Sequence, residues 1–151
     1  MTVIAYRAGV MAGDTSTGWG GDLRTFRDTK VYRFRLNDSI LLVGVSGDSA
    51  SSQKFVNWVR EGMTRPWPEM NKGEDFVVLV AYDDGRIEYW TEKMVPVATA
   101  ERYFAIGNGM GHALCAMDAG ATAEQAVAIT IRRHPGCGGA FTSVRFGDGA
   151  S

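Results

Sequence analysis

Apolar residues in this chain fall into short runs, and most of these runs have the two-residue period or the length of a β-strand. The runs at 39–45 and 76–82 are apolar on both faces, as expected for central strands that are covered on both sides. Turn residues such as Asn37-Asp38 and Asp83-Asp84-Gly85 join neighbouring runs into hairpins. The sequence predicts strands at residues 2–6, 10–14, 30–36, 39–45, 76–82, 86–93, 95–98, 103–106 and 140–146.

Helical spacing of apolar residues appears in three other segments. The first begins at the small and capping residues 46–49 and presents one apolar face to a sheet. The third opens with the capping box Thr122-x-x-Gln125 and ends before Pro135. The predicted helices extend to about Met63, to Ala119 and to about His134.

The order of these elements determines the expected fold class. Strands and helices do not alternate strictly, which disfavours a doubly wound parallel sheet. We expect a single α+β domain over residues 1–151, built as a four-layer αββα sandwich of two mostly antiparallel sheets with helices outside. Residues 15–28 are rich in Gly, Ser, Thr and charged side chains, so the sequence predicts a loop there that lines a cleft.

Composition narrows the classes of function. The formal net charge of −1 gives no field that favours nucleic acid or an anionic membrane as a partner. No apolar run approaches the twenty or so residues of a membrane span, and the N-terminus has no secretory signal pattern. Two cysteines do not form a disulfide framework, which fits a reducing compartment. We therefore expect a cytoplasmic protein.

The first residues carry the most specific chemical signal. Methionine aminopeptidases remove an initiator Met that precedes a small residue, so Thr2 is a candidate mature N-terminus. Its α-amine would titrate near 8 and can accept the proton of its own hydroxyl. One residue would then be both nucleophile and base. The predicted hairpin places Asp14 near Thr2, at the same end of adjacent strands.

With these features the chain resembles the proteasome-type N-terminal-nucleophile (Ntn) hydrolases, including proteasome β-subunits and the HslV peptidase. The resemblance covers essentially the whole chain, although the chain is shorter than most members. The matching features, in order, are Thr2, the strand end Ala12-Gly13-Asp14, Lys30 before a strand, Gly47 at a helix start, the turn Ile106-Gly107-Asn108-Gly109, and the segment His134-Pro135-Gly136-Cys137-Gly138-Gly139-Ala140.

The resemblance implies a role for each matching residue. Thr2 would attack a peptide carbonyl, and the backbone N–H of Gly47 would stabilise the oxyanion. Lys30 would favour the deprotonated forms of the Thr2 amine and hydroxyl, and Asp14 would hold the lysine ammonium. Asn108 would orient the amine, with simple turn chemistry as the equal alternative. Taken without the other motifs, an Asp at a strand end and a lysine would indicate only an ordinary surface ion pair between Asp14 and Lys30.

Three matching positions depart from the proteasome pattern. Asn108 replaces a turn Ser, His134 replaces an Asp, and Cys137 replaces a Ser, all at positions that support the nucleophile in proteasome subunits. The first hypothesis is therefore a threonine peptidase acting on peptides or unfolded proteins. The alternative is a catalytically inactive, self-assembling shell or scaffold subunit. Both imply a homo-oligomeric ring, and the resemblance allows an ATP-dependent unfoldase as partner.

Two further patterns suggest other ligands. Residues 107–111 follow a strand and precede a helix, as phosphate loops do, but the lysine of a phosphate loop and the ribose-binding acid of a βαβ unit are missing. His112-x-x-Cys115 and His134-x-x-Cys137 have zinc-like spacing, yet the resemblance accounts for the second pair without metal. We therefore expect neither a metal nor a cofactor.

Overall fold

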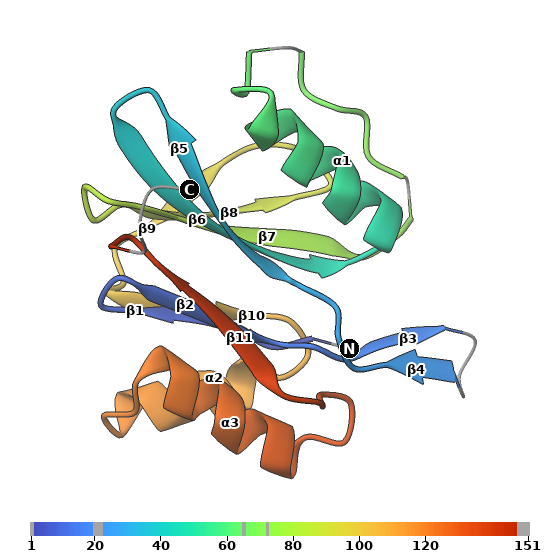
Figure 1. Cartoon of the computed structure of the whole chain (residues 1–151), viewed down its shortest axis with the longest axis vertical. Coiled ribbons are helices and arrows are strands. Elements are labelled where there is room, and N and C mark those ends of the chain that lie inside the picture. Colours follow the sequence, from blue (N-terminus) through green and yellow to red (C-terminus); the bar gives the residue numbers. More distant parts are fainter. Residues whose placement is uncertain (1, 20–22, 65, 72, 148–151) are drawn as a thin grey trace.

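Two large sheets lie face to face, with helix α1 on one side of the pair and helices α2 and α3 on the other (Figure 1). This computed structural model describes residues 2–19, 23–64, 66–71 and 73–147. It has an α+β fold with three sheets and three helices, consistent with an Ntn-type fold. No helix in these ranges is both long and apolar enough to cross a membrane.

The strands form three antiparallel sheets. One has the order β10-β1-β2-β11, the second has the order β5-β6-β7-β8-β9, and the third is the small pair β3-β4. The strands are β1 Ile4–Arg7, β2 Val10–Asp14, β3 Thr17–Trp19, β4 Leu23–Thr25, β5 Val31–Leu36, β6 Ser39–Gly47, β7 Phe76–Tyr82, β8 Ile87–Thr91, β9 Val97–Thr99, β10 Tyr103–Ile106 and β11 Phe141–Arg145. The helices are α1 Ser49–Arg60, α2 Met110–Asp118 and α3 Ala123–Arg133.

The two large sheets approach each other closely around Ile4. A Cβ on Gly44 of β6 would lie 2.5 Å from Ile4 Cγ2 of β1 and 3.0 Å from Met11 Sδ of β2. Fully buried Leu42 and Leu79 belong to the same cluster. Each such side chain contributes about 1.5–3 kcal/mol by leaving water. These contacts fix β1 and β2 against β6, and thereby fix the position of the N-terminal residues.

Capping signals predicted the starts of α1 and α3, and α1 ends earlier than predicted. The capping box of Thr122 and Gln125 begins α3, and Asp48 accepts a hydrogen bond from Ser51 N to cap α1. Helix α1 ends at Arg60 rather than at about residue 63. Gly62 has φ +90°, and its N–H and the next one donate to carbonyls of the last turn, so the chain leaves the helix there.

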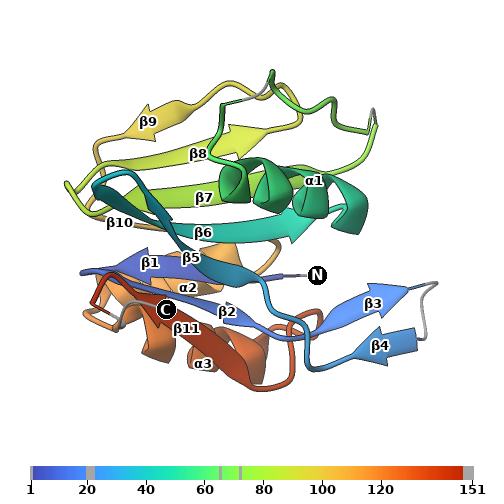
Figure 2. The ribbon, with the colours of Figure 1, turned by 45° about the horizontal axis from the view of Figure 1, so that its top comes forward.

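The prediction of a loop for residues 15–28 is wrong in part. Strands β3 and β4 pair with each other in this segment and form a hairpin that projects beside the body of the molecule (Figure 2). This pair is the third sheet, where the sequence predicted two sheets in all. The segment does line a cleft, because Ser16, Thr17 and Gly18 belong to its wall.

Candidate active site

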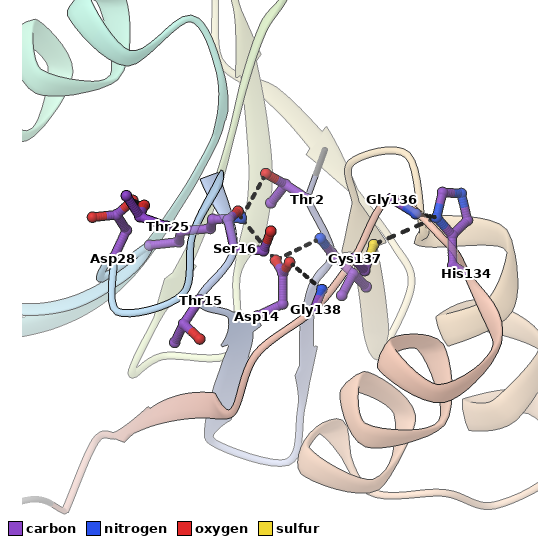
Figure 3. A network of polar contacts seen from close by, with 12 residues as sticks. Thr2, Asp14, Thr15, Ser16, Thr25, Asp28, His134, Gly136, Cys137 and Gly138 are labelled. Atoms are coloured by element: carbon purple, nitrogen blue, oxygen red, sulfur yellow. Dashed lines mark hydrogen bonds and ion pairs between the residues drawn. The ribbon is translucent and has the colours of Figure 1, made fainter. Parts of the chain in front are cut away.

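The first hairpin brings the N-terminal residues and Asp14 together. In the β1–β2 register Ile4 lies opposite Gly13, so the residues just before Ile4 meet the end of β2. The Val3 N–H donates to Asp14 Oδ1 (3.1 Å), and Asp14 N–H donates to Val3 O (3.2 Å). Asp14 is fully buried. Its carboxylate is therefore held on the strand pair, pointing toward Thr2 (Figure 3).

Lys30 joins Thr2 to Asp14. It directly precedes β5, where its carbonyl accepts the Val45 N–H (2.9 Å), and its Nζ reaches back to the hairpin. Nζ donates to Thr2 Oγ1 (3.0 Å), to Asp14 Oδ1 (2.9 Å) and to the carbonyl oxygen of Ser16. The lysine side chain is only 7% exposed, so the interpretation as a surface ion pair is wrong.

The glycine turn after β10 positions the backbone of Thr2. The Gly109 N–H donates to Thr2 O (3.1 Å). Gly107 has φ +93°, and a Cβ there would overlap the Thr2 carbonyl, so only glycine allows this close approach. These residues belong to segment 107–111, which lies between a strand and a helix as phosphate loops do, and here their backbone holds the nucleophile candidate.

Gly47 and Asn108 line the same cleft as Thr2 and Lys30. This cleft has a volume of about 840 Å³, and its other wall residues include 16–18 and 74–77. We call it the Thr2 cleft. Gly47 is exposed at the end of β6 with φ +99°, and a Cβ on it would overlap the Asp75 carbonyl. Four predicted site residues therefore meet at one cavity.

Cys137 and His134 lie behind the site and are not among the residues that line the Thr2 cleft. Cys137 is buried beside the glycine turn, since a Cβ on Gly109 would lie 3.0 Å from its Sγ. Burial, and then the negative charge of Asp14, raises the pKa of the Cys137 thiol to about 11. At neutral pH it is a neutral thiol and a poor nucleophile.

His134 contacts Cys137 rather than Thr2. Its Nδ1 accepts the Gly136 N–H (3.0 Å) and lies 3.8 Å from Cys137 Sγ. Its ring also meets the His112 ring, with centroids 5.4 Å apart. Within the described ranges no three His, Cys, Asp or Glu side chains are grouped so that they could hold a metal ion. His112, Cys115, His134 and Cys137, whose sequence spacing resembles that of zinc ligands, do not form such a group.

Several residues that the sequence did not predict contribute to the site through their backbone, and Thr15 also does so through its hydroxyl. Gly138 N–H donates to Asp14 Oδ2 (3.2 Å), and Thr15 fixes that segment by donating its N–H to Gly138 O (3.3 Å) and its hydroxyl to Ala140 O (2.7 Å). Ser16 accepts from Lys30. The glycines at 138 and 139 were the one sequence signal for a close approach here.

Comparison with known proteins gives a clear result for the fold. No protein-family model matches the sequence, and no curated protein matches it. Among solved structures, HslV from Trypanosoma brucei is 15% identical with a TM-score of 0.66, covering 95% of this chain and 98% of that chain. BPH from Thiobacillus denitrificans, in complex with epoxomicin, is 19% identical with a TM-score of 0.65, covering 95% and 96%.

Anbu proteins are also similar. Anbu (ancestral beta-subunit) from Yersinia bercovieri is 15% identical with a TM-score of 0.72, covering 97% of this chain and 82% of that chain. The Anbu complex from Pseudomonas aeruginosa, a helical assembly, is 16% identical with a TM-score of 0.64, covering 97% and 81%. The chain therefore has the fold of the proteasome-type Ntn hydrolases. The resemblance inferred from the sequence motifs is confirmed at the level of the fold.

Proposed function

We propose that the chain is a threonine-type peptidase subunit whose nucleophile, Thr2, is exposed when Met1 is removed. Met1 lies outside the described residues. The observation that carries the proposal is the buried ammonium of Lys30, which bonds to Thr2 Oγ1 and to Asp14 Oδ1 at the edge of a large cleft. The carboxylate of Asp14 balances the positive charge of Lys30. An ammonium at this distance stabilises a developing alkoxide on Thr2.

The proposed reaction is amide hydrolysis through an acyl-enzyme. Thr2 Oγ1 attacks the peptide carbonyl while the freed Thr2 amine takes the hydroxyl proton. The N–H of Gly47 stabilises the oxyanion, an interaction worth about 3 kcal/mol per donor. The intermediate collapses as the amine returns the proton to the departing peptide nitrogen. A water molecule, deprotonated by the same amine, then attacks the ester, and the carboxylic acid product leaves with Thr2 regenerated.

The remaining predicted site residues have supporting roles in this proposal. Asn108 lies at the cleft and can orient the freed amine through its side-chain amide. Cys137 fills the space behind the Gly107–Gly109 turn, and His134 accepts the Gly136 N–H, so the segment delivers the Gly138 N–H to Asp14. Neither side chain takes part in proton transfer.

We further propose the finer architecture and setting that accompany this function. The contacts of α1 with β6 and β7, of α2 with β1 and β10, and of α3 with β1 and β2 support a four-layer αββα sandwich in a single domain over residues 1–151. The helical assembly of the Anbu complex supports self-association of this chain into a homo-oligomer. Peptides or unfolded proteins in the cytoplasm, delivered by an ATP-dependent unfoldase, would be the substrates.

One observation favours a second candidate, an inactive shell or scaffold subunit. His134 and Cys137 stand where the resembled proteasome subunits have an Asp and a Ser, and neither side chain lines the Thr2 cleft. If those residues are required for chemistry, the fold would serve assembly alone. Covalent labelling distinguishes the two candidates.

The test is intact mass followed by reaction with a peptide epoxyketone, whose two electrophilic centres react with a hydroxyl and a neighbouring amine. The complex of BPH with epoxomicin motivates this probe. We expect a mature chain without Met1 that gains one inhibitor mass. Thr2→Ala should abolish labelling, whereas Thr64→Ala, an exposed threonine outside the cleft, should not. A chain that retains Met1, or labelling that survives Thr2→Ala, would refute the peptidase.

A further inference from the structure

The Thr2 cleft has an unbalanced charge. Among the described residues of its wall one side chain is basic, and the ammonium of that residue, Lys30, is already paired with buried Asp14. The acidic residues in the wall are Asp28, Asp48, Glu74 and Asp75. A cleft lined by one sign of charge, with protein walls around it, raises the local concentration of the opposite charge. The wall therefore presents a negative potential to any side chain that enters beside Thr2.

Two of these carboxylates are held in place by the fold. Asp48 caps α1, and hydrogen bonds from Ser51 keep the pKa of its carboxyl below the usual value. Asp28 accepts the hydroxyl of Thr25, which likewise lowers the pKa of Asp28. Both carboxylates therefore stay ionised at neutral pH. Their hydrogen bonds are used locally, so they contribute charge rather than direct contacts.

The other two carboxylates are available for a ligand. Glu74 and Asp75 are exposed, and neither side chain has a hydrogen-bonding or ion-pairing partner within the described part of the chain. The backbone of Asp75 lies against Gly47, and its carbonyl accepts the Asp48 N–H (2.6 Å). These two side chains therefore stand on the rim of the cleft beside the proposed oxyanion site.

Two buried hydroxyls in the same cleft give an independent indication of a polar ligand. Ser16 is 2% exposed and Ser46 is 9% exposed, both line the cleft, and neither hydroxyl has a partner in the described ranges. Thr142 Oγ1 is the one described side-chain atom that is both sealed from solvent and without a partner. The hydroxyls of Ser16 and Ser46 are therefore not sealed from solvent, and as part of the cleft wall they can accept hydrogen bonds from a cationic group that enters it.

We propose that the Thr2 cleft takes the lysine or arginine side chain of a peptide substrate, and that Glu74 and Asp75 set this preference. The inference rests on the proposed peptidase function and adds its substrate class. Because the two carboxylates are exposed, their attraction for a cation is partly screened by water and salt. We expect about a tenfold preference for a basic over an uncharged side chain at low salt. The preference should shrink as ionic strength rises.

The experiment compares three peptide epoxyketones that differ only in the residue next to the warhead, which is arginine, norleucine or glutamate. Labelling rates are measured by intact mass on the mature full-length chain at about 20 mM and about 500 mM salt. The Debye length is long at the first concentration and short at the second. The expected order is arginine, then norleucine, then glutamate. In the double variant Glu74→Gln, Asp75→Asn the arginine-to-norleucine ratio should fall several-fold, and Glu92→Gln, an exposed acid outside the cleft, should leave it unchanged.

The outcomes separate this inference from the proposed function. Absence of labelling by all three probes would overturn the peptidase itself. Labelling with equal rates for the three probes, or faster labelling by the glutamate probe, would overturn the charge preference and leave the peptidase intact. A ratio that does not respond to the double variant would show that Glu74 and Asp75 do not set the preference. Loss of the arginine advantage at high salt would support an electrostatic origin.

Discussion

Lys30 offers the sharpest test of the site's energetics, because it is both a proposed catalytic group and part of a buried ion pair. Its side chain is 7% exposed and that of Asp14 is 0% exposed. Replacing Lys30 by Met keeps much of the apolar stem but removes the ammonium that bonds to Thr2, Asp14 and Ser16. The carboxylate of Asp14 is then left buried without its counter-ion.

The magnitude follows from the remaining partners of Asp14. Breaking a buried ion pair from one side typically costs 3–5 kcal/mol. Asp14 keeps the backbone N–H groups of Val3 and Gly138, so the cost of Lys30→Met should be near the lower end, about 3 kcal/mol. For a domain of this size, 1 kcal/mol corresponds to about 2–4 °C, so the melting temperature should fall by about 6–12 °C.

The assay is thermal unfolding of wild type, Lys30→Met, Asp14→Asn and the double variant. The double variant removes the uncompensated charge, so it should melt above Lys30→Met, and the two losses should not add. Asp84→Asn, which breaks the exposed Asp84–Arg86 pair, should leave the melting temperature essentially unchanged. A melting temperature for Lys30→Met equal to wild type, or fully additive losses in the double variant, would show that Lys30 does not compensate the buried charge of Asp14.

Three other predictions concern the surroundings of the site. Gly47→Ala should destabilise the chain by about 2 kcal/mol or more in urea unfolding and suppress epoxyketone labelling, because φ is +99° and the new Cβ overlaps the Asp75 carbonyl. Iodoacetamide at pH 8 should alkylate exposed Cys115 only, because a pKa of about 11 leaves about one Cys137 side chain in a thousand as the thiolate. Equal alkylation of both cysteines would contradict this prediction. Thr122→Ala should cost about 1 kcal/mol by removing the capping box, with no change in labelling.

The sequence predicted the main strands because their patterns are strong. The two-face apolar runs became β6 and β7, which pair with each other near the middle of the larger sheet. Strands β3 and β4 were missed because residues 15–28 show no alternation of apolar and polar side chains, and the two strands pair only with each other. An isolated two-stranded hairpin is only marginally stable by itself, so two strands this short leave a weak signal in the sequence.

The side chains of the site were predictable, and its backbone contacts were not. Thr2, Asp14 and Lys30 could be named because the first hairpin and the motif order place them, and the structure joins all three. Every residue except proline has the same backbone N–H and C=O groups, so no side-chain pattern distinguishes the Gly138 N–H or the Ser16 carbonyl as partners of the site. Their roles depend on how distant segments approach each other in the folded chain.

The most direct test of Thr2 as the nucleophile is a crystal structure of the mature chain after reaction with epoxomicin. We expect a chain that begins at Thr2, with the inhibitor in the Thr2 cleft bonded to the hydroxyl oxygen and the amine of Thr2. Lys30 Nζ should lie within hydrogen-bonding distance of the bonded Thr2 oxygen, and the Gly47 N–H should face the inhibitor. A chain that retains Met1 with an empty cleft, or an inhibitor bonded to any other residue, would contradict the claim that Thr2 is the nucleophile.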